Sequence, residues 1–210
     1  MSVKNVMKLI KEKEVKFVDL RFTDTKGKWQ HTAQTVSTID ESTFKDGIMF
    51  DGSSIAGWKD INEADMILKP DPSTAVMDPF TAQPQLILFC DVIEPADGKP
   101  YELDPRSTGK KAEEYLKKSG IGDKCFFGPE AEFFIFDDVK WATNQEYTFF
   151  SIDSEEGAYN TGSEMEGGNM GHRPKDKGGY FPVPPVDSAT DIRAEMVSTM
   201  MEMDLDMEKH

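Results

Sequence analysis

The 210-residue sequence is poor in cysteine and histidine, with 2 and 3 residues respectively. Cys90 and Cys125 each lie within an apolar run, where buried free thiols that behave as small hydrophobic side chains are expected rather than a disulfide. This cysteine usage fits a reducing compartment, so we expect a cytoplasmic protein.

Basic residues are also scarce relative to acidic ones, since 24 lysines and arginines oppose 39 aspartates and glutamates and leave a net charge of −15. Such a charge repels the phosphate backbone of nucleic acids and anionic membrane surfaces, so neither is expected as a partner. Cations, including metal ions, are drawn to any cleft that carboxylates line. Most of the charge is expected to form an ordinary solvated surface.

Long hydrophobic runs are missing as well. No segment approaches the roughly 20 consecutive apolar residues that cross a bilayer. The first residues contain neither a continuous apolar region nor a cleavage site of small residues, and Val3, Val6 and Ile10 follow helical spacing. This pattern predicts a short amphipathic helix rather than a signal peptide. The apolar content of 38% is compatible with a folded core.

The first half of the chain is predicted to consist mostly of strands. Residues 15–22 and 28–36 alternate in the manner of strands around turn residues at 24–27, which predicts a hairpin. Further extended runs, bounded by prolines, lie near residues 66–69, 74–77 and 85–92.

Between these strands, residues 48–58 form a loop of small residues that carries Asp51 and Trp58. A backbone of this kind can approach another surface closely, which favours a functional loop. The alternative is an ordinary connection that a buried Trp58 anchors.

The composition changes near Asp104-Pro105, where a charged segment with helical spacing begins and runs to Ser119. We therefore predict two domains, residues 1–103 and 104–210. In the second, we expect a strand over residues 125–137, a long functional loop over 154–179 and a helix that starts at a capping box, Ser188 to Asp191. Methionines 196, 200, 203 and 207 recur near one face of that helix, which is typical of core packing.

The predicted strand over residues 125–137 contains two acidic residues, Glu130 and Glu132, within an otherwise apolar stretch. Alternate residues of a strand share a face, so their α-carbons would lie roughly 6–7 Å apart and both side chains could reach one pocket. Mg²⁺ or Mn²⁺ would stabilise two such carboxylates. An exposed sheet face on which glutamates alternate with aromatics explains this stretch equally well.

Four motifs in this order and spacing carry a resemblance: Asp51-Gly-Ser-Ser, Gly128-Pro-Glu-Ala-Glu-Phe-Phe, Lys177-Gly-Gly-Tyr-Phe-Pro-Val-Pro-Pro and Glu208-Lys-His. Together they resemble the amino-terminal part of the bacterial type I glutamine synthetases. The resemblance implies an α+β fold, with a small β-grasp domain followed by the first part of an antiparallel-sheet catalytic domain. It also implies a homo-oligomer built as a double hexameric ring, with each active site between neighbouring subunits.

The reaction that this resemblance implies is ATP-dependent ligation of ammonia to L-glutamate, through γ-glutamyl phosphate, to give L-glutamine. By similarity, Glu130 and Glu132 are ligands of two different divalent ions, Mg²⁺ or Mn²⁺, and Glu208 contacts ATP. Asp51 matches the residue that binds ammonium and accepts its proton, acting on the neighbouring subunit's site. Tyr180 matches a residue of the ammonium pocket, although a core tyrosine with a satisfied hydroxyl explains its local sequence too.

The resemblance also implies a catalytic domain that continues for roughly as many residues again, within usual domain sizes. We therefore expect these 210 residues alone to be inactive. Two further interpretations stay open: a related ligase that joins glutamate to another amine, and a non-catalytic fragment that docks onto full-length subunits. Asp51, Trp58 and Tyr180 together favour ammonia as the substrate.

Overall fold

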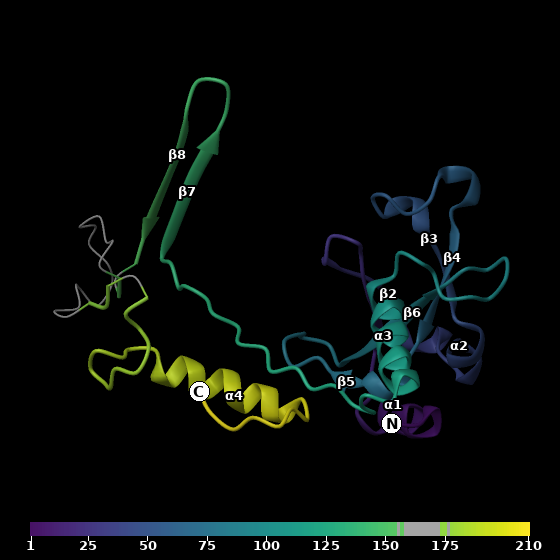
Figure 1. The fold of residues 1–210 in the computed structure, drawn as a ribbon. Helices are drawn as coiled ribbons and strands as arrows, with labels where there is room; N and C mark the ends of the chain where they lie inside the picture. Colours follow the sequence, from purple (N-terminus) through teal and green to yellow (C-terminus); the bar gives the residue numbers. More distant parts are fainter. Residues whose placement is uncertain (155, 158–172, 176) are drawn as a thin grey trace. The chain divides into compact units, whose positions relative to one another are not determined.

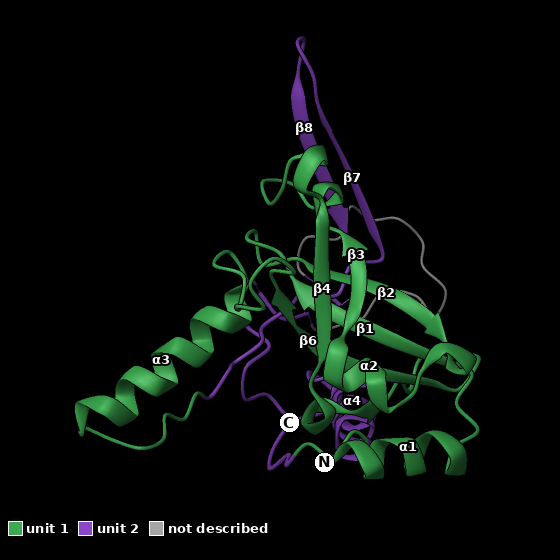
Figure 2. Cartoon of the chain, turned by 90° about the vertical axis from the view of Figure 1, so that its right-hand side faces the viewer, with its two compact units in different colours: residues 1–127, 203–205 green, residues 128–202, 206–210 purple. Residues whose placement is uncertain are grey.

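The computed structural model of the chain describes residues 1–154, 156–157, 173–175 and 177–210. The chain divides into two compact units, each considered by itself (Figure 2). Unit 1 comprises residues 1–127 and 203–205, and unit 2 comprises residues 128–202 and 206–210. Most of the loop predicted over residues 154–179 lies outside the described residues.

Unit 1 is built around one mixed sheet (Figure 1). Its strand order is β2-β1-β6-β4-β3, with β5 also paired to β6. Strands β1 and β6 pair in parallel, and the other neighbours are antiparallel. The helices and strands of unit 1 are α1 (Val3–Glu12), β1 (Phe17–Thr23), β2 (Trp29–Thr35), α2 (Glu41–Asp46), β3 (Ile48–Asp51), β4 (Asp65–Pro70), β5 (Val76–Met77), β6 (Gln85–Ile93) and α3 (Pro105–Ser119). Short 3₁₀ turns lie at Val36–Thr38, Gly52–Ser54, Ile61–Glu63 and Pro72–Thr74.

The hairpin predicted near the amino terminus is confirmed as β1 and β2. The turn between them is closed by Asp24, whose carboxylate accepts hydrogen bonds of 2.9 Å from the amides of Lys26 and Lys28. Gly27 has a φ of +81°, a conformation that L side chains rarely adopt. The polar residues between the two strands therefore make a specific turn.

The hydrophobic core of unit 1 lies between the sheet and the helices α1 and α2. Val18, Leu20 and Phe22 alternate along β1 and are buried, because successive strand residues point to opposite faces. Leu86 and Leu88 of β6, Met66 and Leu68 of β4, Val6 and Ile10 of α1 and Phe44 of α2 join the same core. The amphipathic helix predicted for the first residues is thus confirmed, and its apolar side is buried.

The helix predicted to follow Asp104 is confirmed as α3, which packs against β6. Asp104 caps its first turn, Pro105 occupies a first-turn position that needs no amide donor, and Gly120 ends it with a φ of +72°. These are the start and stop signals that the sequence contains.

Unit 2 contains the antiparallel hairpin of β7 (Asp138–Thr143) and β8 (Thr148–Asp153) and the helix α4 (Thr190–Glu202). The strand predicted over residues 125–137 is wrong, since these residues lie in neither helix nor strand and the strand ladder begins at Asp138. Alternation alone does not make a strand, because a strand also needs a neighbour with which to exchange backbone hydrogen bonds.

The predicted helix near the carboxyl end exists, but it differs in two respects. Its first turn is held by Asp187, whose carboxylate accepts hydrogen bonds from the amide of Ala189 and the hydroxyl of Thr190. It ends at Glu202, before Met203 and Met207, and none of its residues is buried. The prediction that its methionines pack into a core is therefore wrong in this structure.

The two cysteines differ in environment. Both are free thiols, as predicted. Cys90 is buried in the core, which confirms the prediction of burial, whereas Cys125 is exposed and the prediction is wrong for it. Burial raises the pKa of the Cys90 thiol. Among the residues that the structure describes, no helix has both the length and the apolar character needed to cross a membrane.

Candidate functional site

The Asp51 loop begins where β3 ends, and its shape is set by hydrogen bonds to the Asp51 carboxylate. The amide of Ser53 donates to Oδ1 of Asp51 at 2.9 Å and the Ser53 hydroxyl donates to the same oxygen at 2.6 Å. The Ser54 hydroxyl donates to Oδ2 at 3.3 Å. The Ser53 hydroxyl, followed by its amide, lowers the pKa of Asp51, so this exposed carboxylate is ionised at neutral pH.

A glycine after Asp51 lets the loop lie close against β4. The Gly52 amide donates to the carbonyl of Ala64 at 2.7 Å. A Cβ atom on Gly52 would approach the sulfur of Met66 to 2.5 Å, so a side chain at this position would push the loop away from the sheet. Asp51 is paired directly opposite Asp65 in the β3–β4 ladder, which places a second carboxylate beside it.

The far end of the loop is fixed by Trp58, which is buried among aromatic rings. Its ring centroid lies 5.1 Å from that of Tyr101 and 5.5 Å from that of Phe22. The Tyr101 hydroxyl donates to the carbonyl of Trp58 at 2.9 Å. The anchoring role that the sequence allows for Trp58 is thus confirmed, and it leaves the Asp51 end of the loop presented to solvent.

An open depression of about 980 Å³ borders this region, between residues 59–65 and 94–103. Lys59 and Glu94 both line it and form an ion pair of 2.7 Å, and the hydrogen bond that Lys59 donates to Glu94 raises the pKa of Lys59. None of the five predicted site residues lines the depression, so we do not assign the reaction to it.

The other four predicted site residues belong to unit 2. Glu130 and Glu132 are exposed and lie in the segment that forms no strand, so the shared strand face expected for them is not formed. Tyr180 is also exposed, with its ring 4.7 Å from that of Phe181, and is therefore no core tyrosine here. Glu208 is exposed beyond the end of α4.

The donor atoms of Glu130 and Glu132 suit Mg²⁺ or Mn²⁺, since both ions prefer carboxylate oxygen. Two carboxylates nevertheless supply only part of a coordination shell of about six oxygens. Among the described residues, no group of three or more His, Cys, Asp or Glu side chains is arranged to hold a metal ion. The two glutamates fit as ligands that further groups must complete.

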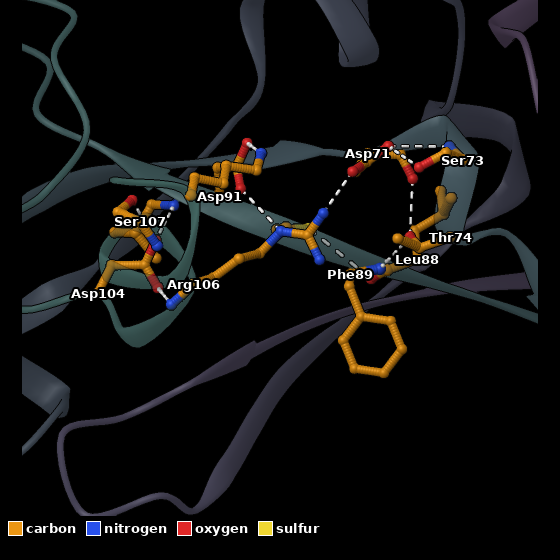
Figure 3. A network of polar contacts seen from close by, with 12 residues as sticks. Asp71, Ser73, Thr74, Leu88, Phe89, Asp91, Asp104, Arg106 and Ser107 are labelled. Carbon is orange, nitrogen blue, oxygen red and sulfur yellow. Dashed lines mark hydrogen bonds and ion pairs between the residues drawn. The ribbon is translucent and has the colours of Figure 1, made fainter. Parts of the chain in front are cut away.

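A polar network at the start of α3 escaped sequence reasoning (Figure 3). Asp104 is completely buried and accepts hydrogen bonds from the Ser107 hydroxyl at 2.6 Å, the Ser107 amide at 3.1 Å and the Arg106 amide at 3.1 Å. Its Oδ2 also accepts a longer bond of 3.4 Å from the amide of Val92 in β6. One carboxylate thus caps the helix and ties it to the sheet.

Arg106 extends this network across the sheet. Its Nε donates to Asp91 of β6 at 2.8 Å, and its Nη2 donates to Asp71 (Figure 3). Burial alone would raise the pKa of Asp71, but hydrogen bonds from Ser73 and the charge of Arg106 hold it below its ordinary value. The sequence signal for the cap is Asp104-Pro105, whereas nothing in the sequence identifies the distant partners of Arg106.

Comparison with known proteins agrees with this fold. A family model described as "Glutamine synthetase, beta-Grasp domain" matches residues 14–95, and one described as "Glutamine synthetase, catalytic domain" matches residues 102–210. The cryo-EM structure of Plasmodium falciparum glutamine synthetase superposes with a TM-score of 0.83 over 100% of this chain and 41% of that chain. Its sequence identity is 24%, so this similarity supports the fold alone.

Several bacterial glutamine synthetases are more similar to this chain in sequence than that structure is. The glutamine synthetase of Azospirillum brasilense is 61% identical over 209 residues, and that of Vibrio cholerae is 60% identical over 210 residues. Each alignment covers 100% of this chain and 45% of the relative, so the chain spans less than half the length of these proteins. The resemblance predicted from the four motifs is confirmed: the chain belongs to the glutamine synthetase family.

Proposed function

We propose that this chain forms the amino-terminal part of an enzyme that ligates ammonia to L-glutamate with ATP, through γ-glutamyl phosphate, to give L-glutamine. The observation that carries the proposal is the 61% identity to a glutamine synthetase over essentially the whole chain. The ionised and exposed Asp51 supports it, because a carboxylate in this state can bind ammonium and accept its proton.

Phosphoryl transfer depends on positioning and on neutralising charge, which divalent ions bound to ATP supply. Glu130 and Glu132 would hold Mg²⁺ or Mn²⁺ as parts of larger ligand sets, and Glu208 would contact ATP. Tyr180 would line the ammonium pocket beside Asp51. In the homo-oligomer that we propose, a double hexameric ring, Asp51 serves the site of the neighbouring subunit.

Two domains carry these roles in the proposal, with the sequence boundary near residue 103. The free thiols of Cys90 and Cys125 fit a cytoplasmic enzyme. We propose that residues 1–210 alone do not make glutamine, because the metal ligands that they supply are too few to complete a site.

The test joins residues 1–210 in frame to the remaining part of the Azospirillum brasilense relative and measures glutamine formation. We expect a product that requires ATP, glutamate, ammonium and Mg²⁺ or Mn²⁺, and none from the 210-residue chain assayed alone. Product with methylamine but not with ammonium would contradict the proposal and favour a ligase for another amine.

Within that fusion, Asp51→Ala should lower kcat by about 100-fold or more, because proton transfer by a positioned group contributes rate enhancements of this order. Asp97→Ala is the matched control, since Asp97 is an exposed aspartate of unit 1 that we assign no role. Equal activity of the two variants would contradict the role of Asp51.

A further inference from the structure

Residues 94–101, which we call the linker segment, follow β6 and fold back on it. The Tyr101 amide donates to the carbonyl of Val92 in β6 at 2.8 Å. Residues 96–101 lie between the two stretches of the chain that match the family models. The linker segment therefore joins the β-grasp domain to the stretch that matches the catalytic domain.

The far end of the Asp51 loop makes two side-chain contacts with the linker segment. The Tyr101 hydroxyl donates to the carbonyl of Trp58 at 2.9 Å, and Lys59 forms an ion pair of 2.7 Å with Glu94. The Nζ atom of Lys59 also lies 5.4 Å from the centroid of the Tyr101 ring, within the range of a cation–π contact. Two consecutive residues of the chain are thus bound to the two ends of the linker segment.

Tyr101 has the properties of a rigid anchor. Its side chain is 6% exposed and packs against Trp58, with the ring centroids 5.1 Å apart. Burial raises the pKa of its hydroxyl, so the group remains protonated and can donate a hydrogen bond at neutral pH. The amide of Asp104, the residue that caps α3, donates to the Tyr101 carbonyl at 3.2 Å. Tyr101 therefore connects the Asp51 loop to the start of α3.

The Tyr101 hydroxyl matters because the Trp58 side chain is held by packing alone. Its indole Nε1 is buried and has no hydrogen-bond partner among the described residues. The Trp58 amide donates to the carbonyl of Ile55 at 3.1 Å, which is a bond within the loop. Because apolar packing is not directional, the bond from Tyr101 is the contact that fixes the Trp58 backbone relative to the linker segment.

We propose that Tyr101 is a positioning residue, which fixes the Trp58 end of the Asp51 loop and thereby holds the Asp51 carboxylate in place for ammonium. The inference rests on the proposed function, because it takes Asp51 as the residue that binds ammonium. The near end of the loop is tied by the bond from the Gly52 amide to the Ala64 carbonyl. A loop released at its far end spends part of its time in other conformations, and its apparent affinity for a ligand falls with the competent fraction.

The first test measures the kinetics of Tyr101→Phe in the fusion with the remaining part of the Azospirillum brasilense relative. The variant keeps the ring and removes the hydroxyl alone. KM for ammonium should rise about fivefold, the factor that one hydrogen bond of typical strength contributes, while kcat at saturating ammonium and the KM values for ATP and glutamate stay unchanged. A general loss of folded enzyme would lower kcat instead. Tyr115→Phe, at a 75% exposed position of α3, is the matched control and should behave as wild type.

Glu94→Gln tests the second contact between the loop and the linker segment. It removes the charge that pairs with Lys59 and should raise KM for ammonium about twofold, since partly exposed ion pairs contribute little. Asp97→Asn is the matched control, because it breaks an ion pair of the same length, 2.7 Å, between Asp97 and Lys99 inside the linker segment. That pair does not involve the Asp51 loop, so KM should not change.

The second test requires no catalysis. Amide hydrogen exchange, followed by NMR on residues 1–210, reports how often the loop opens. Exchange at the amides of Ile55 and Trp58, which donate within the loop, should be about fivefold faster in Tyr101→Phe than in wild type. Tyr115→Phe should exchange at the wild-type rate.

Equal exchange at Ile55 and Trp58 in Tyr101→Phe and wild type would overturn the proposal, because the hydroxyl would then not hold the loop. Faster exchange with an unchanged KM for ammonium in an active fusion would also overturn it, because the loop would then not position Asp51. A wild-type fusion that makes no glutamine would contradict the proposed function, and the exchange experiment would then decide by itself whether Tyr101 holds the loop.

Discussion

In unit 1 the side chains of Leu20, Leu68 and Leu88 are completely buried, whereas in unit 2 Trp141 and Phe150 expose about three quarters of their surfaces. Both regions are rich in apolar residues, so composition does not explain the difference. Unit 1 brings its strands together around a common core with α1 and α2, while the described strands of unit 2 form one hairpin without a covering layer. The same kind of residue is thus buried in the core of one unit and exposed in the described part of the other.

The two units also differ in how they hold the candidate site residues. Unit 1 holds Asp51 in a defined loop, tied by hydrogen bonds at one end and by the buried Trp58 at the other. Unit 2 carries Glu130, Glu132, Tyr180 and Glu208 on exposed segments that do not converge on a metal-binding cluster among the described residues. Of the five candidate residues, Asp51 therefore lies in a loop whose hydrogen bonds fix its shape, while the other four lie on exposed segments.

The largest expected effect on this comparison comes from Leu88→Ala, which should lower the free energy of unfolding of unit 1 by about 3 kcal/mol. Leu88 is completely buried in β6, and removal of such a side chain loses burial energy and leaves a cavity. Urea unfolding followed by the fluorescence of Trp58, with Trp29 and Trp141 replaced by phenylalanine, measures the change. Phe134→Ala in unit 2, at a 56% exposed position, should change the same transition by less than about 0.5 kcal/mol. Equal losses in both variants would break the distinction between the units.

Asp104→Ala should have a smaller effect and lower the free energy of unfolding of unit 1 by about 2 kcal/mol. The substitution leaves the amides of Ser107 and Val92 without their buried acceptor. Asp40→Ala is the matched control, since Asp40 caps α2 at an exposed position and its loss should cost about 1 kcal/mol. The same urea transition measures both. If Asp104→Ala lost no more stability than Asp40→Ala, burial of the capping carboxylate would contribute nothing to the stability of unit 1.

Asp71→Asn should have the smallest effect and lower the free energy of unfolding of unit 1 by less than about 1 kcal/mol, because it weakens the contact with Arg106. Because the folded state lowers the pKa of Asp71 below its ordinary value of 3.8, the carboxylate stabilises unit 1 above that pH. This stabilisation is lost as the pH falls through the lowered pKa. The difference between wild type and Asp71→Asn should therefore be present at pH 7 and vanish in acid. A difference independent of pH would contradict the assignment.

Much of unit 1 follows from its sequence, for physical reasons that particular residues show. The hairpin of β1 and β2, the helix α1 and the helix α3 carry local signals, namely alternation, amphipathic spacing, the Asp104-Pro105 start and the Gly120 stop. The parallel pairing of β1 with β6 and the reach of Arg106 to Asp71 join residues far apart in the chain, so no local pattern specifies them.

In unit 2, local sequence patterns gave two wrong predictions. Residues 125–137 alternate like a strand but lie in neither helix nor strand, and α4 has apolar residues at helical spacing but no buried side chain. Alternation and spacing indicate which face would be covered, while the covering element decides whether the structure forms. The candidate residues Asp51, Glu130, Glu132, Tyr180 and Glu208 came from motif resemblance, and their joint geometry remains a prediction.

The most direct test of the account is amide hydrogen exchange across residues 1–210, measured by mass spectrometry on the chain alone. We expect strong protection in β1, β4, β6 and α3, and weak protection in β7, β8 and α4, because exchange reports the stability of each region's hydrogen bonds. Protection of the hairpin and α4 equal to that of the unit 1 sheet would contradict the claim that unit 2, whose described apolar side chains are not buried, is the less stable of the two units.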